Sequence, residues 1–341
     1  MPSLTSKVVR FHEFGPAEVL KIENAEVHEP GPGEVRIKVA AIGMNFAEAM
    51  WRQNQYIETP KLPSGLGYEV SGTIDMLGAG VNGFRIGAKV ATFPAHNQGD
   101  HPAYGEFAIV PASSVAPYPA TLSDVEAASY WTAYLTGYFA LVEIAKLAAG
   151  QTVLITAASS STGLAAIQIA KAVGARVIAT TRTSKKTATL RNARADVVVA
   201  TEEENLVERV LAETDGKGVD LVYDAVAGKQ LATLGRIIKQ RGHLILYGLR
   251  GGGDLVAPLW DLWTKSIHFH LYTVFNFTGS ASLGLTRDEA AVERAIAFIN
   301  RGIEKGLFKP KVDRTFTLDD VVAAHRYMEA GAQVGKIVIT V

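Results

Sequence analysis

The residues with the clearest chemistry lie in a turn of very small side chains between an apolar strand and an alanine-rich helix. Residues 152–156 are predicted to form a buried strand and residues 163–173 a helix. Small side chains let the backbone approach a pyrophosphate, and the N–H groups of a helix's first turn point at it. Against the dinucleotide pattern G-x-G-x-x-G, the three glycine positions hold Ala158, Ser160 and Gly163, so one glycine remains.

Two interpretations of this turn are open. It either binds the phosphates of a dinucleotide or is an ordinary strand–turn–helix of another doubly wound protein. In the first interpretation, the residues that contact the phosphates are Ser159, Ser160, Ser161, Thr162 and Gly163.

The residues after the next predicted strand, 176–181, indicate which dinucleotide binds. A site for NAD places an Asp or Glu on the ribose hydroxyls about twenty residues past the turn, but the chain has no acid there before Asp196. Hydroxyls and cations stand there instead, and they suit a 2′-phosphate because charge-assisted hydrogen bonds need donors. The alternative is a solvated basic turn. We therefore expect NADPH rather than NADH, with contacts from Thr181, Arg182 and Lys186.

The composition excludes several other kinds of chemistry. The chain has 341 residues and no cysteine, which rules out disulfides, a thiolate nucleophile and thiolate-bound zinc. Its 34 basic and 34 acidic side chains balance, so no overall positive field favours nucleic acid or an anionic membrane. The chain starts without a signal-peptide pattern and has no run of about 18 apolar residues. We expect a cytoplasmic protein with no nucleic-acid or membrane partner.

The candidate residues lie in two parts of the chain with different patterns of predicted secondary structure. The first ~125 residues alternate short strands, such as 35–42, with glycine-rich turns, as expected of an all-β or barrel-like unit. Near Ser123 the pattern changes to strands alternating with helices, which predicts a parallel sheet covered on both faces. The chain ends with two further helices and a strand, predicted near residues 286–305, 318–329 and 336–341.

Short motifs along nearly the whole chain are those of a known family. They are GMNF at 43–46, GLGYEVSG at 65–72, YGEF at 104–107, WTAY at 131–134 and GKIV at 335–338. In this order and spacing the chain resembles the medium-chain dehydrogenase/reductases, within them the zinc-independent, zeta-crystallin-like quinone oxidoreductases. The resemblance implies an α/β protein of two domains. A GroES-like β-barrel catalytic domain is formed by residues 1–125 and 285–341, and a doubly wound, NADP-binding Rossmann domain by residues 126–284.

The resemblance also implies how the chain differs from zinc-using members of the family. Zinc-using members have a cysteine at the position of Asn45 and a histidine at the position of Tyr68. Neither Asn45 nor Tyr68 can supply a thiolate or an imidazole to a metal ion. Histidine pairs that could hold a metal instead are His96 with His101 and His268 with His270. Surface or strand histidines are the simpler interpretation of these pairs. We therefore expect catalysis without zinc.

Family positions around the reaction centre give further expectations. Asn45 and Tyr56 correspond to positions lining the substrate cleft, and we expect both to donate hydrogen bonds to the oxygen that gains negative charge. For Tyr56 the alternative is a partly exposed loop aromatic, and the proton could come from Tyr56 or from solvent. Thr132 resembles a position beside the nicotinamide. Tyr247 and Gly248 follow a strand and are expected in a loop over the nicotinamide, unless that loop is simply a surface loop.

Further expectations concern a carboxylate, the pocket and the assembly. Glu69 is expected to be a structural carboxylate that accepts hydrogen bonds from backbone amides. Residues 268–274 resemble an edge strand that in the family pairs with the same strand of a second subunit. We therefore expect a homodimer. The alternative is an edge that stays within one chain. Aromatic candidates for the pocket, which suggest a bulky or planar ligand, are Trp51, Tyr56, Trp260 and Trp263.

These features predict an NADPH-dependent reductase that transfers a hydride to a quinone or another activated α,β-unsaturated carbonyl, without zinc. The first alternative is an enzyme specific for one enoyl or enone (alkenal) substrate, with incidental quinone activity. The second is a non-catalytic NADPH-binding structural or RNA-binding protein. A net charge of +0 and the lack of a basic–aromatic cluster argue against RNA.

Overall fold

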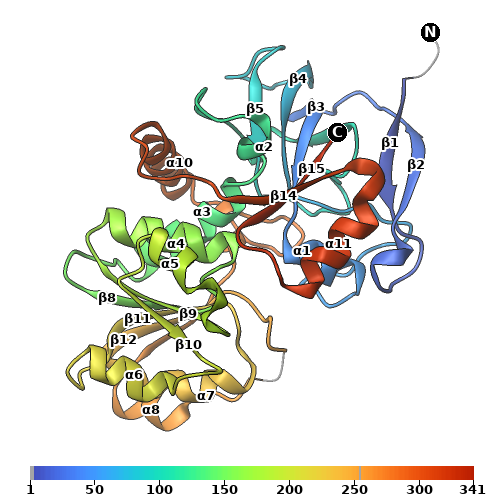
Figure 1. Ribbon diagram of the computed structural model, residues 1–341. Coiled ribbons are helices and arrows are strands. Elements are labelled where there is room, and N and C mark those ends of the chain that lie inside the picture. Colours follow the sequence, from blue (N-terminus) through green and yellow to red (C-terminus); the bar gives the residue numbers. More distant parts are fainter. Residues whose placement is uncertain (1–3, 253–254) are drawn as a thin grey trace. The chain divides into compact units, whose positions relative to one another are not determined.

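The chain forms two compact units in a computed structural model that describes residues 4–252 and 255–341 (Figure 1). Unit 1 consists of the residues up to Thr132 together with 275–304 and 309–341, and unit 2 consists of residues 133–274 and 305–308. No helix in the described ranges is long and apolar enough to cross a membrane. The domain limits at residues 126 and 284 stay predictions.

The main sheet of unit 1 joins the two ends of the chain. Its order is β14-β15-β3-β4-β5-β7, with β6 also paired to β3. The strands are β3 (Glu34–Gly43), β4 (Glu69–Leu77), β5 (Lys89–Thr92), β6 (Phe107–Pro111), β7 (Val115–Pro117), β14 (Val312–Thr317) and β15 (Lys336–Thr340). A separate pair is β1 (Thr5–Arg10) with β2 (Lys21–Glu26). Because β15 runs antiparallel to β3, the C-terminal segment completes a sheet begun by the N-terminal part.

The helices described in unit 1 are α1 (Phe46–Arg52), α2 (Asp124–Ala127), α9 (Phe275–Thr278), α10 (Glu289–Glu304) and α11 (Val321–Ala330). Two of them, α1 and α11, share one core with this sheet. Val35 and Ile37 of β3 are buried in the same core as Trp51 of α1 and Met328 of α11. The alternation of apolar and polar residue types predicted this strand, but Arg36 between these two residues is buried as well.

Unit 2 contains a six-stranded parallel sheet in the order β10-β9-β8-β11-β12-β13. With β8 as strand 1, this is the 3-2-1-4-5-6 order of the Rossmann fold, so the predicted fold class is confirmed. The strands are β8 (Thr152–Ile155), β9 (Arg176–Thr181), β10 (Val197–Ala200), β11 (Val219–Asp224), β12 (Ile238–Leu246) and β13 (His268–Leu271). Val153, Leu154 and Ile155 are all fully buried, as expected of a strand covered on both faces.

Helices cover both faces of the sheet in unit 2. In Figure 1, α4 and α5 lie over one face and α6, α7 and α8 over the other. The helices are α3 (Trp131–Tyr138, which starts in unit 1), α4 (Ser161–Ala172), α5 (Thr187–Asn192), α6 (Leu206–Glu213), α7 (Leu231–Leu234) and α8 (Leu259–Thr264). A π-helix at Phe139–Ile144 continues α3. α4 begins two residues before the predicted start because Ser160 caps it, and β13 ends at Leu271 rather than at 274.

Candidate cofactor and catalytic sites

The small-residue turn of unit 2 joins β8 to α4 and presents the first turn of that helix. The Ser160 hydroxyl accepts a hydrogen bond of 3.0 Å from the Gly163 amide and so caps the helix. The first-turn amides of Ser161 and Thr162 have no acceptor inside the helix, as is general for helix N-termini. They are available to an anion, which the helix dipole also favours.

Gly163 is required by the packing of this helix against its own turn. A Cβ at this position would lie 2.6–2.8 Å from backbone atoms of Ala158, closer than real Cβ contacts come. Ala158 is itself fixed, because its amide donates to the Thr180 carbonyl of β9 at 3.1 Å. The surviving glycine of the pattern therefore has the packing role that the third glycine has in dinucleotide-binding folds.

A buried hydrogen-bond network that the sequence analysis missed fixes the end of β8. The Thr156 hydroxyl donates to Asp224 Oδ1 at 2.6 Å and accepts from the Ala225 amide at 3.0 Å. Asp224 Oδ2 accepts from the Ala227 amide at 2.8 Å. Burial raises the pKa of Asp224. The network ties the carboxyl ends of β8 and β11 together, at the sheet edge where doubly wound proteins bind ligands.

Two guanidinium groups lie near each other in unit 2. Arg182 follows β9, and Arg250 follows β12 in the loop that starts at Tyr247. Burial lowers the pKa of Arg250, and the positive charge of Arg182 lowers it further. An anion between two such cations replaces repulsion with charge-assisted hydrogen bonds. Sequence reasoning found Arg182 but missed Arg250, whose nearness depends on the strand order.

The other residues predicted around the second strand lie in the same turn. Thr181 is the last residue of β9 and is buried, and Lys186 ends a short 3-10 turn at Ser184–Lys186 and is half-buried. The structure also places an acid here, because Glu203 accepts a 2.9 Å hydrogen bond from the Ser184 amide. Glu203 follows β10, the next strand in the sheet, and was not foreseen.

Tyr247 and Gly248 stand at the carboxyl end of β12. The Tyr247 ring stacks on Tyr223 of β11, with centroids 4.0 Å apart and planes at 14°. A Cβ on Gly248 would come within 2.9 Å of the Ala225 carbonyl oxygen. Close approach to the chain's own backbone therefore requires a glycine here, and a place of this loop over the nicotinamide stays a prediction.

Taken together, the described residues of unit 2 fit a dinucleotide with a 2′-phosphate. The first turn of α4 offers amides and the dipole for a diphosphate. Arg182 and Arg250, which are both exposed, offer two positive charges for a further phosphate group. The residues predicted for the phosphates, Ser159 to Gly163, all lie in or directly before the first turn of α4.

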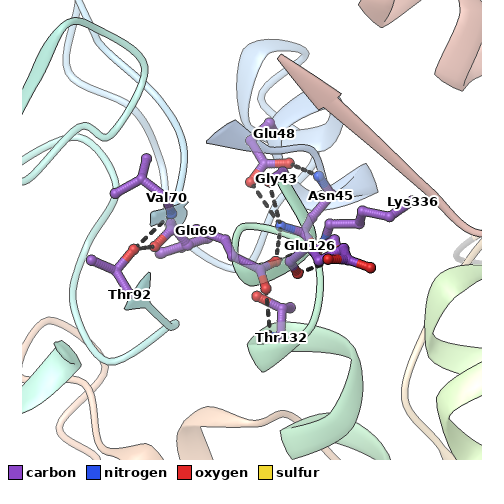
Figure 2. A network of polar contacts seen from close by, with 11 residues as sticks. Gly43, Asn45, Glu48, Glu69, Val70, Thr92, Glu126, Thr132 and Lys336 are labelled. Carbon is purple, nitrogen blue, oxygen red and sulfur yellow. Dashed lines mark hydrogen bonds and ion pairs between the residues drawn. The ribbon is translucent and has the colours of Figure 1, made fainter. Parts of the chain in front are cut away.

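In unit 1, Asn45 lies in a buried polar cluster (Figure 2). Lys336 Nζ is 2.6 Å from Asn45 Oδ1 and 2.7 Å from Glu69 Oε2. Glu69 Oε1 accepts from the Thr132 amide at 3.1 Å, so Glu69 does accept from a backbone amide, but from one at the start of α3 and not from its own turn. Two predicted site residues, Asn45 and Thr132, are thus joined through Glu69. Lys336 was missed, because it stands 291 positions from Asn45.

Glu48 completes the cluster from the first turn of α1. One carboxyl oxygen accepts from the Asn45 backbone amide, and the other is 3.4 Å from Asn45 Nδ2. The side chain is fully buried. Burial raises the pKa of Glu48 to about 8, although the Lys336 charge opposes the shift. Glu48 is therefore mostly a neutral acid at pH 7.

Tyr56 is anchored by aromatic neighbours in unit 1. Its ring lies 6.5 Å from that of Trp51, edge to face, and 6.4 Å from that of Tyr68. Burial raises the pKa of Tyr56, and the Glu48 and Glu58 carboxylates add to this, so its phenol stays protonated. Tyr56 lies in a bend after α1 and is half-buried against the core, which fits the alternative of a partly exposed loop aromatic. Its role as a hydrogen-bond donor to the acceptor stays a prediction.

A cavity of about 320 Å³ in unit 1 lies beside this aromatic group. Trp51 lines it together with Glu58, Asn97 and Ser282. The Asn97 amide donates to Glu58 Oε1 at 2.9 Å, which holds the wall on that side. The predicted pocket residues Trp260 and Trp263 lie elsewhere, exposed on α8 of unit 2.

The histidine pairs considered as metal ligands have other surroundings. His96 is buried, and its pKa falls to about 3 because of burial and the charge of His101. His268 and His270 project from β13, next to His243 of β12. Across residues 4–252 and 255–341, no group of three or more His, Asp or Glu side chains is arranged to hold a metal ion.

Comparisons with known proteins agree with these two units. The model of the "Alcohol dehydrogenase GroES-like domain" matches residues 31–120, and that of the "Zinc-binding dehydrogenase" matches residues 161–292. Quinone oxidoreductase of Rattus norvegicus is 30% identical over 336 residues, covering 98% of this chain and 97% of that protein. The crystal structure of Escherichia coli quinone oxidoreductase complexed with NADPH aligns with 28% identity and a TM-score of 0.88, over 98% and 100% of the chains.

A mycobacterial structure complexed with NADPH is also similar, at 30% identity and a TM-score of 0.88, over 98% of this chain and 100% of that one. A GroES-like unit and a Rossmann unit with a dinucleotide-binding turn define the medium-chain dehydrogenase/reductase class. Within that class, the chain belongs to the quinone oxidoreductase family.

Proposed function

We propose that the chain is an NADPH-dependent reductase that transfers a hydride to a quinone or another activated α,β-unsaturated carbonyl compound. The observation that carries the proposal is the placement of Arg182 and Arg250 in the sheet of unit 2. Both follow strands whose carboxyl ends share a sheet edge with the end of β8 and the turn before α4. Two cations there suit the 2′-phosphate that distinguishes NADPH from NADH. Similarity to quinone oxidoreductases over 98% of the chain supports the quinone as acceptor.

The residues of unit 2 have the task of holding and orienting the cofactor. The amides of Ser161 and Thr162 bind the diphosphate, and Arg182 and Arg250 bind the 2′-phosphate. NADPH, when bound, supplies the hydride. The Thr156–Asp224 network keeps the turn in place, so that little rearrangement is needed on binding.

The residues of unit 1 have the task of stabilising the reduced acceptor. Hydride addition leaves negative charge on an oxygen of the quinone or enone, and hydrogen-bond donors stabilise that charge. The donors are the Asn45 amide and the Tyr56 phenol. Because Tyr56 stays protonated, it donates a hydrogen bond at all ordinary pH values. The proton that completes the product comes from Tyr56 or from solvent.

Steady-state kinetics test the proposed function. We expect 1,4-benzoquinone, 9,10-phenanthrenequinone or an enone to accelerate NADPH oxidation by the purified chain, and NADH to be a poorer donor. Absorbance of the reduced nicotinamide reports the rate, and the chain with NADPH but no acceptor is the control.

The pattern over the acceptor panel separates the alternatives. High rates with one enone and low rates with quinones would favour a specific enone reductase. If NADPH binds but none of the acceptors accelerates its loss, the proposed reductase function is wrong.

The homodimer is part of the same proposal. β13 is the last strand at one side of the sheet described for unit 2, and such an edge can pair with a second copy. Beside it in sequence, α8 exposes Trp260 by 77% and Trp263 by 73%, with the rings stacked 6.3 Å apart. Exposed aromatic patches of this kind mark interaction surfaces. A two-fold axis at β13 buries the same patch on both subunits.

Replacing Trp260 and Trp263 by serine should shift the chain from dimer to monomer, because the exposed apolar surface is lost. Sedimentation velocity checks the mass. Ile86→Ser is the control, since Ile86 is comparably exposed but lies in unit 1. A monomeric wild type, or a double variant that stays dimeric, would contradict this interface. A cytoplasmic location, the lack of a nucleic-acid partner and catalysis without zinc stay predictions.

A further inference from the structure

Two carboxyl groups and one ammonium group share the buried space around Asn45 (Figure 2). Glu48, Glu69 and Lys336 are each at most 1% exposed. Lys336 contacts Glu69 at 2.7 Å, and this pair balances its own charge. Glu48 then has no cation of its own, so its charge state decides whether the cluster is neutral or negative.

The cluster also fixes which way the Asn45 amide donates. Its oxygen is held by the Lys336 ammonium at 2.6 Å. Its NH₂ group has only long contacts of 3.3–3.4 Å, to the Gly43 carbonyl and to the carboxyl oxygens of Glu48 and Glu69. Contacts of that length are weak. The NH₂ group is therefore held in direction but can still donate to another oxygen.

We propose that Glu48 is a positioning residue for the reaction, which in its neutral acid form leaves the Asn45 amide able to stabilise negative charge on the acceptor. The inference rests on the proposed function, because it assigns Asn45 to the acceptor oxygen. Ionised Glu48 opposes this in two ways. Its carboxylate holds the Asn45 NH₂ as a stronger acceptor, and its charge repels the developing anion.

Glu48 is the group in this cluster that changes charge between neutral and mildly alkaline pH. The titratable groups around it are Lys336, Glu69, Tyr56, Tyr68 and Tyr104. His325 of α11 packs against Tyr104. Burial raises the pKa values of the three tyrosines, which stay neutral. Burial lowers the pKa of His325 to about 3, so it is neutral too. The pKa of Glu48, about 8, falls between neutral and mildly alkaline pH.

The kinetic test compares pH profiles of wild type, Glu48→Gln and Glu126→Gln. With an enone acceptor, we expect the wild-type kcat/KM to fall about tenfold between about pH 7 and about pH 9. Glu48→Gln mimics the neutral acid and keeps a capping side chain, so it should stay active and lose this fall. Glu126 is the matched control, since it is the equivalent capping residue of α2 and is partly exposed. Glu126→Gln should behave as wild type.

A second measurement follows the proton itself, without cofactor or substrate. Infrared difference spectroscopy of the apo chain should show a carboxylic-acid C=O band at neutral pH that disappears above about pH 9. The band should be absent in Glu48→Gln and present in Glu126→Gln.

The outcomes separate this inference from the proposed function. An alkaline fall that persists in Glu48→Gln, or a wild type without the acid band, overturns the role of Glu48 even if quinones are reduced. A chain that reduces no acceptor contradicts the proposed function. The infrared band then still decides the state of Glu48: its presence supports the neutral acid, and its absence overturns it.

Discussion

Replacing Arg182 by alanine should weaken NADPH binding by roughly 10- to 150-fold and leave NADH binding nearly unchanged. The variant removes a charge-assisted donor to the 2′-phosphate, and a hydrogen bond of this kind contributes about 1.5–3 kcal/mol. NADH has no 2′-phosphate, so it loses no partner. Equilibrium titration of the apo chain with each dinucleotide, followed by fluorescence, measures the two dissociation constants.

Two further variants show whether the effect belongs to this pair of cations. Arg250→Ala should have the same selective effect, because Arg250 and Arg182 are close enough for their charges to interact. Arg191→Ala is the matched control: Arg191 is an exposed arginine of the same unit whose contact is a long one of 3.5 Å to the Asp196 carbonyl. It should leave both affinities unchanged. Equal weakening of NADPH and NADH by Arg182→Ala would show that this side chain does not select the 2′-phosphate.

The sequence predicted those parts of the cofactor site that depend on local order. The run Val153–Leu154–Ile155 indicated a strand buried on both faces, and the small residues after it indicated a turn into a helix. Gly163 and Ser160 follow from the same short segment, because the contacts that explain them, to Ala158 and to the first turn of α4, are a few residues away. Local patterns therefore sufficed to predict the turn and the helix that follows it, and the contacts of these residues with the cofactor stay predictions.

Contacts that depend on the three-dimensional arrangement were missed. Arg182 and Arg250 follow β9 and β12, which are separated in the sheet by β8 and β11, so only the folded sheet shows that their long side chains approach each other. Glu203 reaches the Ser184 amide because β10 pairs with β9. Each of these contacts needs the strand order, and a single sequence does not contain it.

The Asn45 cluster was missed for a related reason. Lys336 reaches Asn45 because β15 pairs with β3, and this pairing brings together two residues that are 291 positions apart in the chain. Glu48 stands in the first turn of a short helix, where a glutamate is usually exposed and interacts with the helix dipole. Its full burial beside Lys336 of β15 does not follow from this local position.

Replacing Lys336 by methionine should lower the free energy of unfolding by about 3–5 kcal/mol, the largest stability change we expect in unit 1. The side chain is 1% exposed and its partner Glu69 is fully buried, so the variant leaves a carboxylate with no cation in a dry interior. Breaking such a pair costs more than the pair itself contributes, because the remaining charge is desolvated and unpaired. Urea unfolding measures the change, and hydrogen exchange of β3 and β15 assigns it to unit 1.

An exposed ion pair of nearly the same length gives the control. Lys7 and Asp319 are 2.8 Å apart, against 2.7 Å for Lys336 and Glu69, but their side chains are 44% and 69% exposed. Lys7→Met should therefore change the free energy of unfolding by only about 0–1 kcal/mol. Distance is matched between the two pairs, so the difference between the variants isolates the effect of burial.

The double variant Lys336→Met with Glu69→Gln decides whether the unpaired charge is the cause. Glutamine can still accept from the Thr132 amide, as Glu69 does at 3.1 Å, but it carries no charge. We expect the double variant to be more stable than Lys336→Met alone, because removing both charges leaves nothing uncompensated in the interior. If the two substitutions instead add, the loss comes from the packing of the lysine stem, and the Lys336–Glu69 pair is not what holds Asn45 in place.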